Sequence, residues 1–329
     1  MDGIYALSGK QLEKDKTMSE SRGIAYSKGR YMPVDEATIP LLDPAFTKSD
    51  VVFDVVSAWD GAFFKLDEHM ARFRSSCEYI RVTPPYSDDE MRSIIAECAT
   101  QAGFDNACIY FLCTRGRYAG GAPTGDPRES ENEFIAYAVP YYWIVPTDRP
   151  NAGAHLWVTE TVRRAPNEAI NQRAKNFNRM DLTRAQFEAL DAGADAPVLL
   201  SMDGFITEGP GFNVWILKDG KVLTPGENLL EGITRQSVFE LCAEAGMQAE
   251  SANLTKEDLQ EADEVFVSST GGGVMPVTLI NDKPVGNGAP GITTGKLSDN
   301  YWKKRSEGWH STPVTDLLEP KVSQAAGAD

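Results

Sequence analysis

The 329-residue sequence has no apolar run of about 18 residues, so we expect no transmembrane helix. The first twenty residues are polar and lack the apolar core that a signal peptide needs, which leads us to expect a cytoplasmic protein. Basic residues are also few: the sequence has 32 lysines and arginines but 48 acidic residues, which gives a net charge of -16. That charge argues against nucleic acid and anionic membranes as partners.

Residues that bind metals or form disulfides are scarce too. There are only three histidines, so a histidine-rich metal site is poorly supported and we expect no metal. The five cysteines are odd in number and form no CxxC pair, which predicts reduced, buried thiols. The remaining composition, 42% hydrophobic and 24% charged, is that of a folded globular protein, and the length suggests about two domains.

Strand-like and helix-like segments are mixed in both halves of the chain without a regular alternation. This mixture predicts an α+β fold with largely antiparallel sheets and flanking helices. We expect a hairpin at 23–33, strands at 51–56, 62–66, 107–114, 133–139, 154–162, 197–201, 213–218 and 265–269, and helices at 67–80, 87–101, 181–191, 234–245 and 294–304. The predicted organisation is an N-terminal extension at 1–20, a small domain at 21–139, a linker at 140–150, a large domain at 151–305 and a loosely held tail at 306–329.

Two predicted element boundaries carry groups that suit a phosphate. Gly232-Ile233-Thr234-Arg235 opens a helix, where Thr234 is a reasonable cap and free backbone N–H groups face outward. Ser268-Ser269-Thr270 ends a strand and runs into three glycines, so hydroxyl groups and an approachable backbone lie together. Taken alone, the first is more simply an ordinary capped helix, and the second is equally a flexible turn.

Two further residues suit a different chemistry. Glu208 lies between a strand and a Gly-Pro-Gly turn, where a carboxylate can pair with a cationic ring nitrogen. Lys175 lies just before a predicted helix, and a lysine in a partly dry pocket can lose its proton and form a Schiff base. Taken alone, each is more simply a solvated surface residue.

Together the four features describe one ligand with a phosphate, a basic ring nitrogen and an aldehyde, and pyridoxal 5'-phosphate fits that description. Along the chain, the four features lie in the motifs AKN, TEGPGFN, GITR and STGGGVMP. Three further motifs precede them, namely IPLLDPAFTKSD, WDGAFFKLDEHMARF and TVRRAP. With these motifs the chain resembles the fold-type IV pyridoxal phosphate-dependent aminotransferases, which include the branched-chain and D-amino acid aminotransferases. The resemblance is closest to the (R)-selective amine transaminases and covers about residues 23–302.

The resemblance implies a role for each matching residue. Lys175 is the lysine that holds the cofactor and later moves the substrate proton, and Glu208 pairs with the ring nitrogen. His69 and Arg72 form an HxxR unit in which Arg72 binds the phosphate. The other implied cofactor contacts are Ile233, Thr234, Ser269 and Thr270. The fold implied is a two-domain one with the cofactor between the domains, in a homodimer whose second subunit completes the site.

The resemblance also implies the reaction and its partners. An amine or amino acid donor gives its nitrogen to the cofactor, and a keto acid such as pyruvate then accepts it, in a ping-pong sequence. A mobile-loop arginine, Arg117 or Arg128, is implied to bind the acceptor carboxylate. The sequence departs from the (R)-amine branch where Lys48 replaces histidine, Phe53 replaces tyrosine, Arg179-Met180 replaces Trp-Gly and Pro210 replaces serine.

These departures leave the donor open. Lys48 and Arg179 either bind the carboxylate of a donor or are structural or interface residues. The leading interpretation is an (R)-amine transaminase. The alternatives are a D-amino acid or branched-chain aminotransferase, a pyridoxal phosphate lyase of the aminodeoxychorismate type, and a catalytically silent relative, which the joint presence of Lys175, Glu208 and Arg72 argues against.

Overall fold

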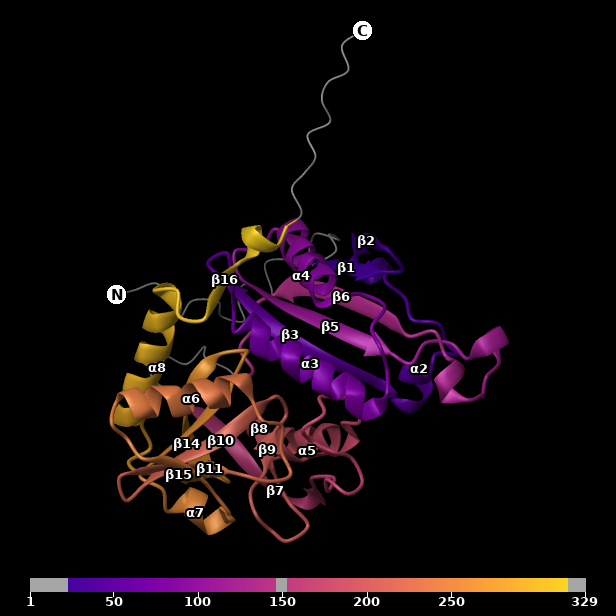
Figure 1. Ribbon diagram of the computed structural model, residues 1–329. Helices are drawn as coiled ribbons and strands as arrows, with labels where there is room; N and C mark the ends of the chain where they lie inside the picture. Colours follow the sequence, from indigo (N-terminus) through magenta and orange to yellow (C-terminus); the bar gives the residue numbers. More distant parts are fainter. Residues whose placement is uncertain (1–22, 146–152, 319–329) are drawn as a thin grey trace, which may run out of the picture.

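The computed structural model describes residues 23–145 and 153–318 of the chain. The predicted N-terminal extension at 1–20 lies outside these residues, as does the second part of the predicted linker, 146–150. The described residues form two sheets, one built mainly from each half of the chain, with helices packed on both (Figure 1).

The first sheet has seven strands in the order β16-β4-β3-β5-β6-β1-β2, and every pairing in it is antiparallel. Its strands are β1 (Ile24–Ser27), β2 (Arg30–Pro33), β3 (Val51–Trp59), β4 (Ala62–Phe64), β5 (Ala107–Thr114), β6 (Glu133–Pro140) and β16 (Ser311–Pro313). Helices α3 (Leu66–Ile80) and α4 (Asp88–Ala102) cover one face, and the short α2 (Pro44–Lys48) precedes β3. The capping box between Ser87 and Glu90 fixes the start of α4.

Strand β3 lies inside the first sheet and is buried on both sides, and alternate side chains along it point to opposite faces of the sheet. Val52 and Val56 pack with α3 and α4 in the first core, whereas Val51, Phe53 and Val55 belong to a cluster on the opposite face. That opposite face looks toward the second half of the chain and supplies one wall of a cavity.

The second sheet has a main path of strands in the order β12-β11-β10-β13-β14-β7-β8. Its members are β7 (Ala154–Arg163), β8 (Ala196–Leu200), β9 (Glu208–Gly209), β10 (Phe212–Lys218), β11 (Lys221–Pro225), β12 (Ala249–Ala252), β13 (Glu264–Ser269), β14 (Gly273–Ile280) and β15 (Lys283–Pro284). Three of its pairings, β7–β8, β7–β14 and β11–β12, are parallel, so this sheet is mixed rather than antiparallel throughout. The helices of this half are α5 (Met180–Asp191), α6 (Ile233–Glu244), α7 (Lys256–Gln260) and α8 (Ile292–Ser306).

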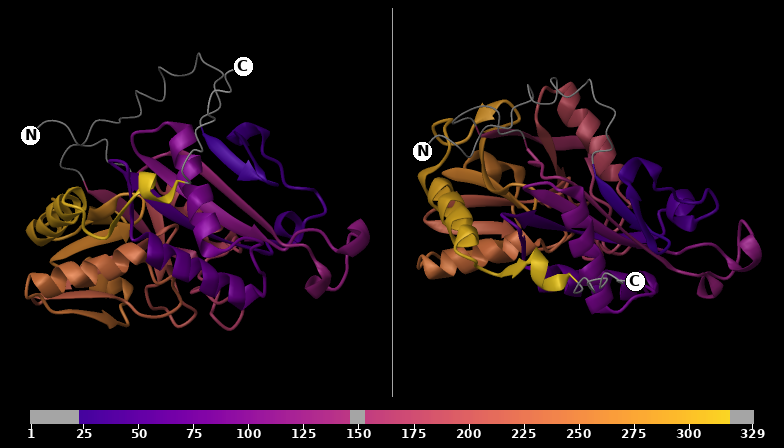
Figure 2. Two further views of the ribbon diagram at one scale, coloured as in Figure 1. Left: turned by 45° about the horizontal axis from the view of Figure 1, so that its top comes forward. Right: turned by 90° about the horizontal axis from the view of Figure 1, so that it is seen from above.

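The C-terminal segment corrects one expectation. After α8 the chain returns to the first half, where β16 pairs with β4 and Val314 is buried against the first core (Figure 2). The predicted loosely held tail is therefore wrong for 311–317, because these residues extend the sheet edge. An ion pair between Lys65 and Glu240 of α6, with nitrogen and oxygen 2.6 Å apart, also joins the two halves.

Most predicted elements are confirmed to within a few residues. The elements without a clear sequence signal are α2, α7, β9, β11, β12, β14, β15 and β16. All five cysteines are free and buried, as expected. None of the described helices is long and apolar enough to cross a membrane.

Candidate active site

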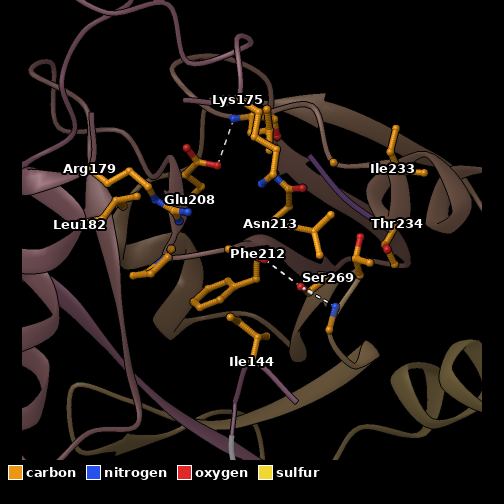
Figure 3. A pocket seen from close by; sticks show the side chains of 18 of the residues that line it. Ile144, Lys175, Arg179, Leu182, Glu208, Phe212, Asn213, Ile233, Thr234 and Ser269 are labelled. Carbon is orange, nitrogen blue, oxygen red and sulfur yellow. Dashed lines mark hydrogen bonds between the residues drawn. The ribbon is translucent and has the colours of Figure 1, made fainter. Parts of the chain in front are cut away.

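A cavity of about 350 Å³ lies between the two halves of the chain. Its walls come from β3 and β5 of the first sheet, the segment before α5, the β9–β10 turn, the start of α6 and the loop after β13. The predicted site residues that line it are Phe53, Arg72, Lys175, Arg179, Glu208, Ile233, Thr234, Ser269 and Thr270. Figure 3 shows Glu208 and Arg179 on one side, Ile233 and Thr234 on the other, and Lys175 between them.

Lys175 is held by its backbone against the first sheet. Its carbonyl oxygen accepts a hydrogen bond from the Phe53 N–H at 3.0 Å, and its own N–H donates to Ser76 Oγ of α3 at 3.0 Å. The amine lies 4.6 Å from the centre of the Phe53 ring. Burial lowers the pKa of the Lys175 amine to about 7, and the positive charges of Arg72 and Arg179 add to the effect. The amine is thus readily neutral, as a nucleophile or a general base must be.

Glu208 is buried, and the protein holds each of its carboxylate oxygens. Oε1 accepts a hydrogen bond from Arg164 Nε at 3.0 Å and lies 3.0 Å from Arg164 Nη2. Oε2 accepts from the backbone N–H of Leu230 at 3.0 Å. Because a carboxylate oxygen has two acceptor positions, Oε2 retains one that can face the cavity.

The start of α6 offers backbone N–H groups to the cavity. Gly232 is the N-cap and no side chain caps the helix, so the prediction that Thr234 caps it is wrong. Thr234 stands instead in the first turn, buried and lining the cavity. A Cβ on Gly232 would lie 2.2 Å from Asn213 Oδ1, so only glycine fits beside that side chain. The positive end of the helix dipole therefore faces a space that suits an anion.

Arg72 reaches the cavity from α3 and is fixed by a buried carboxylate. Its Nε donates to Asp54 Oδ2 at 2.8 Å and its Nη2 to Asp54 Oδ1 at 2.8 Å. His69 Nδ1 lies 2.7 Å from the same Oδ1, so both members of the predicted HxxR unit meet at Asp54. Burial raises the pKa of Asp54, but the charges of Arg72 and His69 outweigh it and hold the pKa well below its usual range. Arg72 Nη1 donates at 3.2 Å to the carbonyl of Glu231, next to the α6 N-cap.

The loop after β13 is tied to the neighbouring chain segments. Ser269 Oγ donates to the Gly211 carbonyl at 2.8 Å and accepts from the Gly271 N–H at 3.1 Å. The Tyr141 hydroxyl donates to the Thr270 carbonyl at 3.1 Å and accepts from the Gly272 N–H at 2.7 Å. Ser269 and Thr270 are thus presented to the cavity by a fixed rather than a flexible turn.

The predicted substrate-binding residues divide into two groups. Phe53 and Arg179 line the cavity, with the Arg179 guanidinium 5.9 Å from the centre of the Phe53 ring. Lys48, Arg117 and Arg128 are exposed and do not line the cavity of their own chain. Lys48 Nζ instead donates to the Tyr118 hydroxyl at 3.2 Å, and the Arg128 guanidinium pairs with Asp126.

Sequence reasoning missed the cavity residues Arg164, Tyr110 and Tyr142 and the supporting residue Asp54. Two of these four residues stand out in the sequence. Asp54 is the one charged residue in the apolar run VVFDVV, and Arg164 lies two residues after the buried Val162, on the face that alternation assigns to the interior. Tyr110 and Tyr142, whose hydroxyl groups hydrogen bond to each other, left no signal. Tyr110 lies in β5, where an aromatic residue is common, and Tyr142 follows β6 in a segment rich in aromatic residues.

The residues present fit pyridoxal 5'-phosphate. The cavity combines an amine whose pKa is about 7, a carboxylate with one acceptor position left, and an uncapped helix start beside an arginine. Glu208 and Thr234 stand on opposite sides (Figure 3), which matches a ligand with a basic ring nitrogen at one end and a phosphate at the other.

The chain is similar to known proteins over most of its length. The model of the family described as Amino-transferase class IV matches residues 51–280. The D-alanine aminotransferase of Bacillus licheniformis is 30% identical over 274 residues, covering 81% of this chain and 91% of that protein. The branched-chain-amino-acid aminotransferase of Pseudomonas aeruginosa is 26% identical over 293 residues, covering 87% and 94%. The crystal structure of the T.th. branched-chain amino acid aminotransferase with pyridoxamine 5'-phosphate aligns with a TM-score of 0.81 at 28% identity, covering 89% and 99%.

Proposed function

This chain belongs to the class IV aminotransferases and is a pyridoxal 5'-phosphate-dependent enzyme, and from that premise we propose that it transfers an amino group from an (R)-configured primary amine to a keto acid such as pyruvate. The two half-reactions alternate at one site in a ping-pong sequence. The observation that carries the proposal is the cavity itself, which is lined together by Lys175, Glu208 and the N-terminus of α6.

We assign the roles within that space as follows. When bound, the cofactor withdraws electrons from the substrate Cα. Lys175 would hold the cofactor covalently and, with its amine free, would take up the proton from that carbon and return it, which a pKa near 7 permits at neutral pH. Glu208 would accept a hydrogen bond from the protonated ring nitrogen. The phosphate would be held by the N–H groups at Ile233 and Thr234, the Thr234 and Thr270 hydroxyls and Arg72, with Ser269 supporting the loop.

One observation favours carboxylated donors among the (R)-configured ones. In the part of the chain that the structure describes, the Arg179 guanidinium lines the cavity and no protein group forms an ion pair or hydrogen bond with it. An unpaired cation in such a space favours a donor that brings a carboxylate, and D-alanine is a donor of this kind. We therefore propose D-amino acid transamination as the second candidate function, which the similarity to a D-alanine aminotransferase supports.

The test is a comparison of donors with pyruvate, or 2-oxoglutarate for D-alanine, as the acceptor. We expect turnover with an (R)-arylalkylamine and with D-alanine, and little with the (S)-amine or L-leucine. A preference for (S)-amines or L-amino acids contradicts the stereochemical part of the proposal. Release of pyruvate from a substrate without any acceptor would instead indicate the lyase alternative.

Replacing Arg179 tests the basis of the donor preference. We expect Arg179→Trp to raise the ratio of kcat/KM for the (R)-arylalkylamine over that for D-alanine by roughly ten- to a hundredfold, the value of one charge-assisted contact. The matched control is Arg173→Trp, because Arg173 is exposed, pairs with Glu231 and lies outside the cavity. An unchanged ratio in Arg179→Trp would place the guanidinium outside donor recognition.

We also propose a homodimer in which each subunit completes the cavity of the other. The segment that carries Arg117 and Arg128 and the neighbouring α2 project from the body of the molecule (Figure 1), in line with a role for Lys48, Arg117 or Arg128 at a partner's cavity. Beside them Leu41 and Phe46 are 75% and 68% exposed, an apolar surface of the kind that interfaces cover. Analytical ultracentrifugation at assay concentration tests this, and a monomeric active enzyme would contradict it.

For the location of the enzyme we propose the cytoplasm. Five free, buried thiols suit a reducing compartment. Cell fractionation with detection of the enzyme in another compartment would contradict this assignment.

A further inference from the structure

Arg164 forms hydrogen bonds with Glu208 and with two further side chains, Asp181 and Gln172, and none of the roles proposed above involves it. It is 5% exposed and follows the end of β7, where its N–H donates to the Leu200 carbonyl at 2.9 Å. Its Nε and Nη2 both meet Glu208 Oε1 at 3.0 Å. Its Nη1 donates to Asp181 Oδ2 at 2.6 Å, and its Nη2 also donates to Gln172 Oε1.

The two supporting side chains are themselves fixed. Asp181 Oδ2 accepts a further hydrogen bond from the Ala165 N–H at 2.8 Å, and Oδ1 accepts from the Leu182 N–H at 2.7 Å. Gln172 Nε2 donates to the carbonyls of Ala165 and Ile170 at 2.8 and 2.9 Å. The guanidinium is therefore locked in place before any ligand binds, and it holds Glu208 in one orientation.

We propose that Arg164 is a positioning residue. It occupies Glu208 Oε1 with its own hydrogen bonds and so leaves Oε2 as the acceptor for the cofactor ring nitrogen. The inference rests on the proposed role of Glu208. Arg164 takes both contacts on Oε1, and the Leu230 N–H takes one position on Oε2, so one acceptor position of the carboxylate remains for the ring.

The charge of Arg164 serves the same end. A buried carboxylate without a cation is unstable as an anion. Asp181 balances the guanidinium in turn, so Glu208, Arg164 and Asp181 form an alternating chain of charges. Among the described residues, Arg179 is the other arginine on the Glu208 side of the cavity (Figure 3). Without Arg164, the Glu208 carboxylate would turn toward Arg179 and away from the ring.

The test compares Arg164→Gln, Glu208→Gln and the double variant as holoenzymes. Each is loaded with cofactor that carries an isotope-labelled ring nitrogen, and the NMR shift of that nitrogen reports whether it is protonated, independently of turnover. The control is Arg163→Gln, because the neighbouring Arg163 guanidinium donates to the carbonyls of Glu160 and Val162 and has no contact with Glu208. Melting of each apoprotein checks folding, and Arg164→Lys, which keeps the charge, replaces Arg164→Gln if the latter does not fold.

We expect Arg164→Gln to move the ring-nitrogen signal toward the unprotonated value and to lower kcat roughly ten- to a hundredfold, as loss of a partner that orients an active-site ligand does at metal sites. Arg164→Lys should give a smaller change, and Arg163→Gln none. In the Glu208→Gln background the Arg164 substitution should have little further effect, because it acts through Glu208.

Two results separate failure of this inference from failure of the proposed function. If Glu208→Gln shifts the ring signal and Arg164→Gln does not, Glu208 keeps its role and the inference about Arg164 is overturned. An equal loss of kcat from Arg164→Gln in both backgrounds overturns it as well. If Glu208→Gln itself leaves the ring signal unchanged, the proposed role of Glu208 fails, and the inference fails with it.

Discussion

Lys175→Ala is expected to abolish transamination, with a loss in kcat of at least about a thousandfold. In the proposed mechanism, the substitution removes both the group that holds the cofactor covalently and the base that moves the substrate proton. No other lysine lines the cavity in the part of the chain that the structure describes, so none can take over. The measurement is steady-state turnover of the variant at saturating cofactor, with the best donor of the parent enzyme.

Two controls separate the chemical role of Lys175 from a structural one. Lys283→Ala, on an exposed strand outside the cavity lining, should leave turnover unchanged. A small primary amine added to Lys175→Ala should restore part of the activity, because it replaces the base but not the tether. Borohydride reduction of the parent holoenzyme followed by peptide mapping should place the cofactor on Lys175, and a label on another lysine would refute the assignment.

The fold was largely predictable because most of its elements carry local signals. The Asp60-Gly61 turn, the Ser87–Glu90 capping box and the apolar runs of β5 and β6 each specify their own structure over a few residues. The edge strands β12 and β16 carry no such signal, because none of their residues is fully buried and their strand conformation depends on partners far away in sequence. Tertiary pairing therefore decides the segments that local pattern leaves undecided.

The site divides in the same way. Lys175, Glu208 and the α6 start belong to short motifs and could be found from the sequence. The partners that hold them could not, since Arg164 is 44 positions from Glu208 and Asp54 is 18 from Arg72. Thr234 illustrates the limit within a motif, because the residue type suits a cap but the helix begins one position earlier, at Ile233. In the proposed homodimer, the arginine that meets an acceptor carboxylate is set by the subunit interface, which sequence spacing does not encode.

Glu208→Gln is expected to retain the cofactor and lose turnover by about a hundredfold or more, the effect of removing an electrostatic group aimed at developing charge. Arg164 keeps its hold on the side-chain oxygen, so the new amide nitrogen must face the Leu230 N–H and the ring. An amide N–H donates where the carboxylate accepted, so the ring nitrogen becomes an acceptor and loses its proton. The ring then withdraws electrons less strongly from the substrate Cα, while the phosphate contacts on the opposite side of the cavity are untouched.

Titration of the apoenzyme with pyridoxal 5'-phosphate and single-turnover kinetics measure these two effects separately. We expect the dissociation constant to change by less than about tenfold and the rate of the chemical step to account for the loss. Glu231→Gln is the matched control, since Glu231 is close in sequence and carries the same charge, but its carboxylate pairs with the exposed Arg173. A weakened affinity with an unchanged chemical step would mean that Glu208 anchors the cofactor rather than tunes it, and turnover close to that of the parent enzyme would remove Glu208 from the mechanism.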